Sequence, residues 1–281
     1  MKKIIKYLFL LTGGSFILAS CNDFLDREPL DSVTPDNFFF TENDLAAYAV
    51  KHYNFTTHEG FNAGIWRNDN ATDNQAATDY DKKWIPGQWK VPEAYDNPAS
   101  NDPWYFSAIR EANYFLETVV PRFEKGEIEG SETNIKHYIG EMYFLRAKNY
   151  LSKLETFGDF PIIKNTLPDE SVSLIQASKR EPRHKVARFI LEDLDLAIGL
   201  LTNTISGGKN RITKNAALLL KSRAALYEAS WLTYHKGTAL VPGGPGWPGK
   251  AEDIADFNID TEIAFFLKEA KAAAKEVIGN A

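Results

Sequence analysis

Five stretches of the chain repeat apolar residues every three or four positions, and this spacing limits the possible folds more than any other feature. An α-helix turns once in 3.6 residues, so side chains at this spacing share one face that can pack on a core. The stripes are Tyr105, Ile109, Ala112, Leu116 and Val119; Ile139, Tyr143, Ala147, Tyr150 and Leu154; Ala187, Ile190, Leu194, Ala197 and Leu201; Ala217, Leu220, Ala224, Tyr227 and Trp231; and Ile263, Phe266, Ala270, Ala274 and Val277. No comparable strand alternation accompanies them, so the predicted fold class is mainly α.

A further, shorter helix is predicted over 42–53. The residues Thr41-Glu42-Asn43-Asp44 form a capping-box pattern, in which the first and fourth side chains satisfy backbone N–H groups at a helix start. The last helix is expected to begin near Thr261, after a loop rich in glycine and proline at 242–249.

One short pattern occurs twice on these predicted helices. Arg-Ala-x-x-Tyr stands at 146–150 and again at 223–227. Alanine on a helix stripe lets a neighbouring helix approach closely, and the tyrosine fills the next gap. The arrangement suits a tetratricopeptide-like scaffold of helix pairs with units enlarged by loops; coincidence between alanine-rich helices is the alternative interpretation.

The amino terminus has the pattern of a secretory signal. A basic start is followed by an apolar stretch from Tyr7 to Leu18, which is too short to span a membrane. The sequence Leu18-Ala19-Ser20-Cys21 matches a bacterial lipobox, so residues 1–20 are predicted to be a signal peptide and Cys21 to carry lipid. Residues 21–40 then form a lipidated tether, and 41–281 a helical domain. The alternative is a buried cysteine without a special role.

Charge and motifs exclude several function classes. Of 32 basic residues, three lie before position 21, so the remaining chain carries 29 minus 38, or −9, and would repel nucleic acid. The five histidines lack metal-site spacing, and no serine lies in G-x-S-x-G. The loop Gly244–Gly249 fails as a phosphate loop because its prolines remove amide donors. We therefore predict no catalytic residue, no cofactor and no metal site, while a loosely built calcium site stays open.

Several blocks of the chain together resemble the SusD/RagB family. The most specific block is Gly140-Glu141-Met142-Tyr143-Phe144-Leu145-Arg146-Ala147, followed by Phe157-Gly158-Asp159-Phe160-Pro161-Ile162. Further matching blocks are 24–34, 38–53, 104–116, 193–194 and 211–227. The similarity covers nearly all of 21–281 and corresponds to the first half of a typical member. We therefore expect a partial sequence, truncated at its carboxyl end.

The resemblance implies a non-catalytic lipoprotein of the outer membrane. Members of this family bind oligosaccharides outside the cell, as partners of TonB-dependent importers. The expected partners are thus a SusC-like transporter, a glycan and, through the lipid anchor, the membrane, with no nucleic acid. The expected location is the outer membrane, lipid-anchored and exposed at the surface.

The ligand face is predicted in the irregular segment 54–103, where helical spacing fails. A sugar ring needs a flat aromatic to stack on and polar groups around its rim. The candidate residues are Trp84, Trp89, Tyr80, Tyr95, Arg67, Asn101 and, in the later glycine-rich loop, Trp247. Packing onto the helices is the competing interpretation for each tryptophan. Trp104 and Trp231 are expected to pack in the core.

Three functions are consistent with these observations. The leading hypothesis is a cell-surface lipoprotein that binds an oligosaccharide or polysaccharide and passes it to a TonB-dependent transporter. The second is a helical-repeat lipoprotein scaffold that docks a protein partner or captures peptides. The third is an exported glycoside hydrolase.

Overall fold

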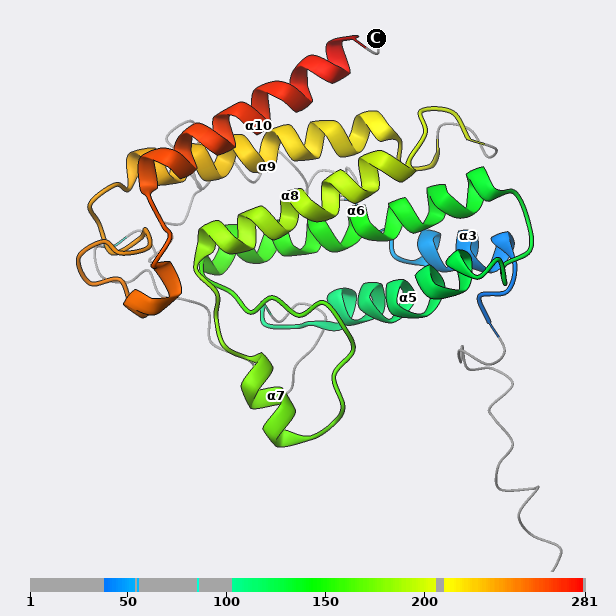
Figure 1. Ribbon diagram of the computed structural model, residues 1–281, viewed down its shortest axis with the longest axis horizontal. Helices are drawn as coiled ribbons and strands as arrows, with labels where there is room; N and C mark the ends of the chain where they lie inside the picture. Colours follow the sequence, from blue (N-terminus) through cyan, green and yellow to red (C-terminus); the bar gives the residue numbers. More distant parts are fainter. Residues whose placement is uncertain (1–37, 54, 56–84, 86–102, 206–209, 280–281) are drawn as a thin grey trace, which may run out of the picture. The chain divides into compact units, whose positions relative to one another are not determined.

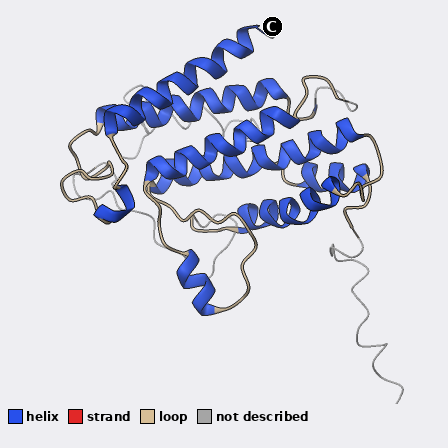
Figure 2. Ribbon diagram, viewed as in Figure 1, coloured by secondary structure: helices blue, strands red, loops and turns tan. Residues whose placement is uncertain are grey.

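Seven α-helices hold nearly all the regular structure in the described part of this computed structural model, which comprises residues 38–53, 55, 85, 103–205 and 210–279 (Figure 2). They are α3 (Glu42–Lys51), α5 (Ser107–Glu124), α6 (Glu132–Phe157), α7 (Ser171–Ala177), α8 (Arg183–Leu200), α9 (Lys214–Tyr234) and α10 (Ile259–Gly279), with a 3-10 helix η4 at Ala251–Ile254. Within those residues the β-structure consists of two isolated bridges, so the mainly-α prediction is confirmed. All these helices lie in the second of two units of the chain, Phe39–Ala281.

The long helices pack side by side in the order of the chain. α5 contacts α6, α6 contacts α8, α8 contacts α9 and α9 contacts α10, while α3 lies against α6 (Figure 1). This succession of helix on helix gives the tetratricopeptide-like scaffold that the sequence predicts. The short helix α7 buries no residue and lies outside the layer, carried on long loops between α6 and α8 (Figure 1). The sequence analysis does not predict α7, because its residues have no apolar side chains at helical spacing that pack on the core.

The start of α3 forms as its sequence predicts. The Thr41 side chain accepts a hydrogen bond from the Asp44 backbone, and the Asp44 carboxylate accepts from the Thr41 backbone, completing the capping box. A capping residue of this kind contributes about 1 kcal/mol to helix stability. The helix ends at Lys51, two residues before the predicted end.

α6 is the centre of the fold and is buried around most of its circumference. It contacts α3, α5 and α8, and Tyr150 within it is fully buried. A Cβ atom at Gly140 would lie 3.0 Å from the Leu201 side chain and 3.1 Å from that of Leu200, so glycine permits the close approach of α8. The helix ends at Phe157 and is capped by Gly158, whose φ of 73° favours glycine.

The two copies of the Arg-Ala-x-x-Tyr pattern have different environments. Both alanines, in 146–150 and in 223–227, are buried between helices, as the sequence predicts. The arginines differ: Arg146 is buried and pairs with Asp193 on α8 through two hydrogen bonds of 2.7 Å, whereas Arg223 is exposed. The pattern therefore marks close helix packing in both copies, and a buried ion pair in the first.

The structure supplies two further observations on the function classes. None of the described helices combines the length and the apolar character that crossing a bilayer requires. Likewise, the described residues contain no group of three histidine, cysteine or carboxylate side chains placed to hold a metal ion.

A candidate ligand-binding cleft between α3, α5 and α6

A cleft of about 440 Å³ opens between the end of α3, the start of α5 and residues 142–156 of α6. Its volume lies within the range of pockets that hold small ligands, about 300–1,000 Å³. The lining comes from all three helices: Lys51, His52, Pro103, Tyr105, Ser107, Ala108, Ile109, Glu111, Ala112, Met142, Leu145, Lys148, Asn149, Ser152, Lys153 and Thr156. We call it the α3–α5–α6 cleft.

The surface of this cleft offers one aromatic ring and several polar groups. Tyr105 is 40% exposed, and neither its hydroxyl nor those of Ser107 and Ser152 bond to another described residue. The Asn149 amide donates to the Leu145 carbonyl at 2.8 Å and retains a second N–H and its carbonyl oxygen. A flat ring beside unused hydroxyl and amide groups can both stack on a ligand and hydrogen-bond to it.

His52 and Glu111 form the polar wall of the cleft. His52 Nδ1 lies 3.1 Å from Glu111 Oε2, which places the proton of a neutral ring on Nδ1. Burial lowers the pKa of His52, the neighbouring Glu111 carboxylate raises it, and burial has the larger effect. The wall therefore consists of a neutral imidazole bound to a carboxylate.

The cleft lies between the two points where the irregular segment leaves and rejoins the helices. His52 precedes this segment, and Pro103 is its last residue. The Lys153 ammonium donates to the Pro103 carbonyl, and Lys148 lies 5.4 Å from the centre of the Phe55 ring. Both ends of the segment are thus attached to α6.

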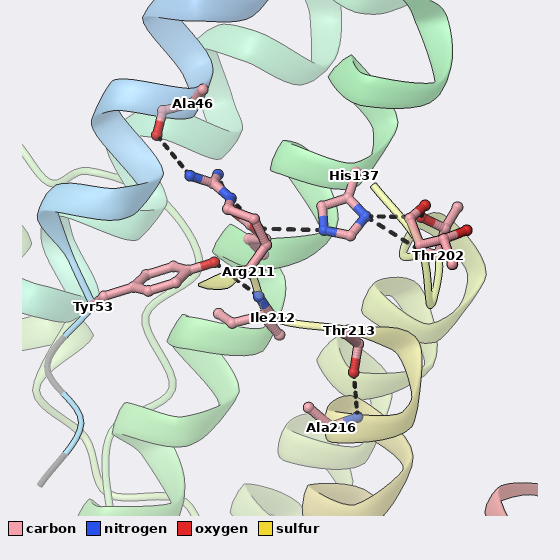
Figure 3. Close-up of polar contacts among 10 residues, drawn as sticks. Ala46, Tyr53, His137, Thr202, Arg211, Ile212, Thr213 and Ala216 are labelled. Carbon is pink, nitrogen blue, oxygen red and sulfur yellow. Dashed lines mark hydrogen bonds and ion pairs between the residues drawn. The ribbon is translucent and has the colours of Figure 1, made fainter. Parts of the chain in front are cut away.

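A buried polar cluster anchors the end of α3 at the start of α9 (Figure 3). The Tyr53 hydroxyl accepts from the Ile212 backbone at 3.0 Å, and the Arg211 guanidinium donates to the Ala46 carbonyl at 3.3 Å. Arg211 also binds both oxygens of the buried Glu141 carboxylate, with Nε to Oε1 at 2.8 Å. Such a bidentate pair fixes both distance and orientation.

His137 completes this cluster on its far side (Figure 3). The Thr202 backbone donates to His137 Nδ1 at 3.2 Å, so the proton of the neutral ring is on Nε2. That nitrogen lies 3.3 Å from Oε1 of Glu141. The ring and the carboxylate are both fully buried, so the cluster joins α6 to the ends of α3 and α8 out of contact with water.

Most of the predicted site residues lie outside the described residues. These are the lipidation residue Cys21 and the ligand-face residues Trp84, Trp89, Tyr80, Tyr95, Arg67 and Asn101. Trp247 is described: it is half-buried, and its Nε1 donates to the Asp159 carboxylate at 2.8 Å. This bond holds Trp247 against the chain just after α6, among residues that do not line the cleft.

The expectation that Trp104 and Trp231 pack in the core is wrong, because both are half-buried. Trp104 precedes α5 and packs at a tilt on Phe157, with ring centres 4.0 Å apart. Trp231 donates from Nε1 to the Leu240 carbonyl at 2.9 Å and lies under the Arg183 guanidinium. An indole N–H needs a polar partner, and both rings meet polar groups at the edge of the helical layer.

Sequence reasoning missed Tyr105 and His52 as cleft residues. Tyr105 was assigned to an apolar stripe, and His52 falls within the helix predicted over 42–53. The structure places Tyr105 two residues before α5 and His52 directly after α3. Pro103 indicates that helical structure is interrupted just before Tyr105, and His52 lies near the end of the predicted helix. Neither signal shows that the side chains of Tyr105 and His52 line the same cleft.

The fold and the cleft together define a class: an α-helical repeat protein with a polar surface cleft. Residues 23–226 match the SusD-like family described as "Starch-binding associating with outer membrane". This match covers well over half of the chain, and the chain belongs to that family.

Named relatives agree with this assignment. The chain is 27% identical over 258 residues to SusD-like protein P2 of Formosa agariphila and 26% identical over 231 residues to SusD-like protein P38 of the same organism. These alignments cover 89% and 79% of this chain, but 45% and 42% of the relatives. The chain thus spans about half the length of the curated relatives that it matches.

A solved structure shows the same fold. A crystal structure of a SusD-like protein from Bacteroides fragilis superimposes with a TM-score of 0.54 at 25% sequence identity. The superposition covers 73% of this chain and 38% of the other.

Proposed function

We propose that this chain belongs to a cell-surface lipoprotein that binds an oligosaccharide or polysaccharide and passes it to a TonB-dependent outer-membrane transporter. Family membership supports the class, since the family description names starch binding and association with the outer membrane. In this proposal Cys21 carries the lipid, binding involves no catalysis, and the transporter is a SusC-like partner.

The observation that supports glycan binding most directly is the chemistry of the α3–α5–α6 cleft. Sugar rings present apolar C–H faces and a rim of hydroxyl groups, so they need stacking and many hydrogen bonds at once. The cleft offers Tyr105 for stacking and the polar groups of Ser107, Asn149 and Ser152 for hydrogen bonds. Each such bond contributes about 0.5–1.5 kcal/mol net, so an open site requires several of them.

We further propose that the irregular segment supplies the rest of the ligand face. Trp84 and Trp89 are its candidate stacking platforms, with Tyr80, Tyr95, Arg67 and Asn101 beside them in sequence. Because both ends of the segment are attached to α6 next to the cleft, cleft and segment can contact one extended glycan chain.

Affinity electrophoresis in gels that contain different polysaccharides tests this proposal. At least one polysaccharide should retard the wild-type chain. The double variant Trp84→Ala/Trp89→Ala should lose that retardation, and Tyr105→Ala should weaken it roughly three- to tenfold, which is the range expected for one aromatic contact.

Tyr234→Ala is the matched control, because Tyr234 ends α9, is 83% exposed and does not line the cleft. Retardation of this control should equal that of the wild type. If the tryptophan and Tyr105 variants were retarded as strongly as the wild type, the proposed site would be wrong. Glycan cleavage that is lost when acidic residues are changed would instead favour a hydrolase.

A further inference from the structure

A second cavity, of about 370 Å³, lies on the other side of the α5 start from the cleft. It opens between the first turns of α5, the chain after α6 and the short helix α7. Most of its walls are apolar, with a few polar residues among them: Trp104, Phe106, Ile109, Arg110, Asn113, Pro161, Ile163, Asn165, Leu167, Leu174, Ser178 and Arg180. We call it the Trp104 cavity. It shares the buried side chain of Ile109 with the α3–α5–α6 cleft.

The aromatic wall of this cavity is held in place from behind. The Trp104 ring packs on Phe157 and Phe160, with ring centres 4.0 Å and 5.8 Å away. Phe106 stacks on Phe160 at 5.1 Å with the planes 10° apart, and Phe160 is fully buried. Since these contacts already order the wall, ligand binding does not carry the entropic cost of ordering it.

Two of the polar side chains in the lining already use their hydrogen-bond donors. The Asn113 amide donates to the Ile163 and Asn165 carbonyls at 2.8 Å and 3.3 Å, and its oxygen accepts from Arg146. The Ser178 hydroxyl donates to the Leu174 carbonyl at 2.7 Å. Neither group has a donor left for the hydroxyl rim of a sugar.

The two arginines of the lining differ from these groups. Arg110 and Arg180 are exposed, and their guanidinium groups form no hydrogen bond or ion pair with another described residue. Arg180 lies over the Trp104 ring, with its Cζ atom 4.9 Å from the ring centre. The lining contains no aspartate or glutamate, although the chain as a whole has a net charge of −6.

We infer that the Trp104 cavity binds an amphipathic anion, a carboxylate carried on a flat apolar body. The apolar body would lie against the ordered aromatic wall, and the carboxylate would bind to the guanidinium groups of Arg110 and Arg180. A neutral sugar fits poorly, because most of its hydroxyl groups would be desolvated against apolar walls, and because the unpaired donors of the cavity are cationic and favour an anion. The inference concerns a different site from the proposed glycan cleft and does not depend on that function.

Isothermal titration calorimetry with two matched probes tests the inference on the full chain. Cinnamate has a flat apolar body and a carboxylate, and cinnamamide has the same body without the charge. Cinnamate should bind at least about tenfold more tightly than cinnamamide, because hydrogen bonds to charged groups are the stronger kind. The difference should shrink as salt is added.

Variants locate the binding. Arg110→Gln and Arg180→Gln should each weaken cinnamate binding several-fold, whereas Arg223→Gln, an exposed arginine on α9 outside the lining, should not change it. Leu174→Glu should abolish cinnamate binding by placing a like charge in the wall. Leu174 is 39% exposed on a helix that buries no residue, so this variant should keep its helical circular dichroism spectrum.

Three results would overturn the inference. They are equal affinity for cinnamate and cinnamamide, wild-type affinity for cinnamate in the Arg110→Gln/Arg180→Gln double variant, and no heat of binding at millimolar cinnamate. None of these results bears on retardation by polysaccharides, so the glycan proposal is judged separately.

Discussion

At the scale of single residues, His184 is an unusual buried group. It is 6% exposed, its Nδ1 has no hydrogen-bond partner among the described residues, and its ring lies 4.5 Å from that of Phe257. Burial, together with the charges of Lys185 and Arg188, lowers the pKa of His184 from 6.5 to about 4. The folded protein therefore holds this imidazole in its neutral form.

This lowered pKa makes the stability of the protein depend on pH. Below the unfolded value of 6.5 the unfolded chain binds a proton that the folded chain does not, so stability falls until the pH reaches about 4. Between about pH 7.5 and pH 5 the wild type should lose about 2 kcal/mol more unfolding free energy than His184→Gln. Urea denaturation at both pH values measures this difference, and equal losses in the two proteins would contradict the assignment.

At the scale of the elements, buried ion pairs join helices that also pack through apolar stripes. Arg183 at the start of α8 donates to both carboxylate oxygens of Glu228 on α9, with an Nη2–Oε2 distance of 2.8 Å. Both residues are at most 2% exposed. A pair taken out of water adds little net stability, but removing one partner leaves an uncompensated buried charge.

Glu228→Gln should consequently destabilise the protein by about 3–5 kcal/mol, since it leaves the Arg183 guanidinium buried without its paired carboxylate. Glu252→Gln is the matched control: its pair with Lys250 joins side chains that are both more than 70% exposed, so the change should cost less than about 1 kcal/mol. Thermal or urea unfolding of both variants measures the contrast. A similar small effect in both would show that the α8–α9 pair is not desolvated.

At the scale of the whole molecule, the proposal places membrane attachment at the amino terminus. No described helix has the length and apolar character of a membrane span, and the proposed attachment is the lipid on Cys21. One acyl chain anchors a protein only marginally, so several chains are required for stable attachment.

Cys21→Ala should therefore move the protein from the membrane fraction to the soluble fraction and abolish incorporation of labelled palmitate. Ser20→Ala, which keeps a small residue before the cysteine, should leave both unchanged. In detergent extracts, the wild type should co-purify with a TonB-dependent barrel protein. Palmitate labelling of the Cys21→Ala variant would contradict the lipidation proposal.

The sequence alone determined the helical class and the order of the long helices. These follow from local physics: the spacing of Ile109, Ala112 and Leu116 and the capping box at Thr41 act within a few turns of one helix. The family was predicted separately, from the resemblance of blocks such as 140–147 and 157–162. The short α7 was not predictable, because it has no apolar stripe to reveal it.

Only the tertiary structure decided which residues meet. Tyr105 and His52 line one cleft although 53 positions separate them, and Trp104 and Arg180 share a cavity across 76 positions. Helical spacing shows on which face of its helix a residue lies, but not which neighbouring element covers that face. Trp104 and Trp231 were therefore predicted to lie in the core, although they lie at its edge. Burial and charge pairing depend on how the helices pack against one another, and no pattern within a single helix contains that information.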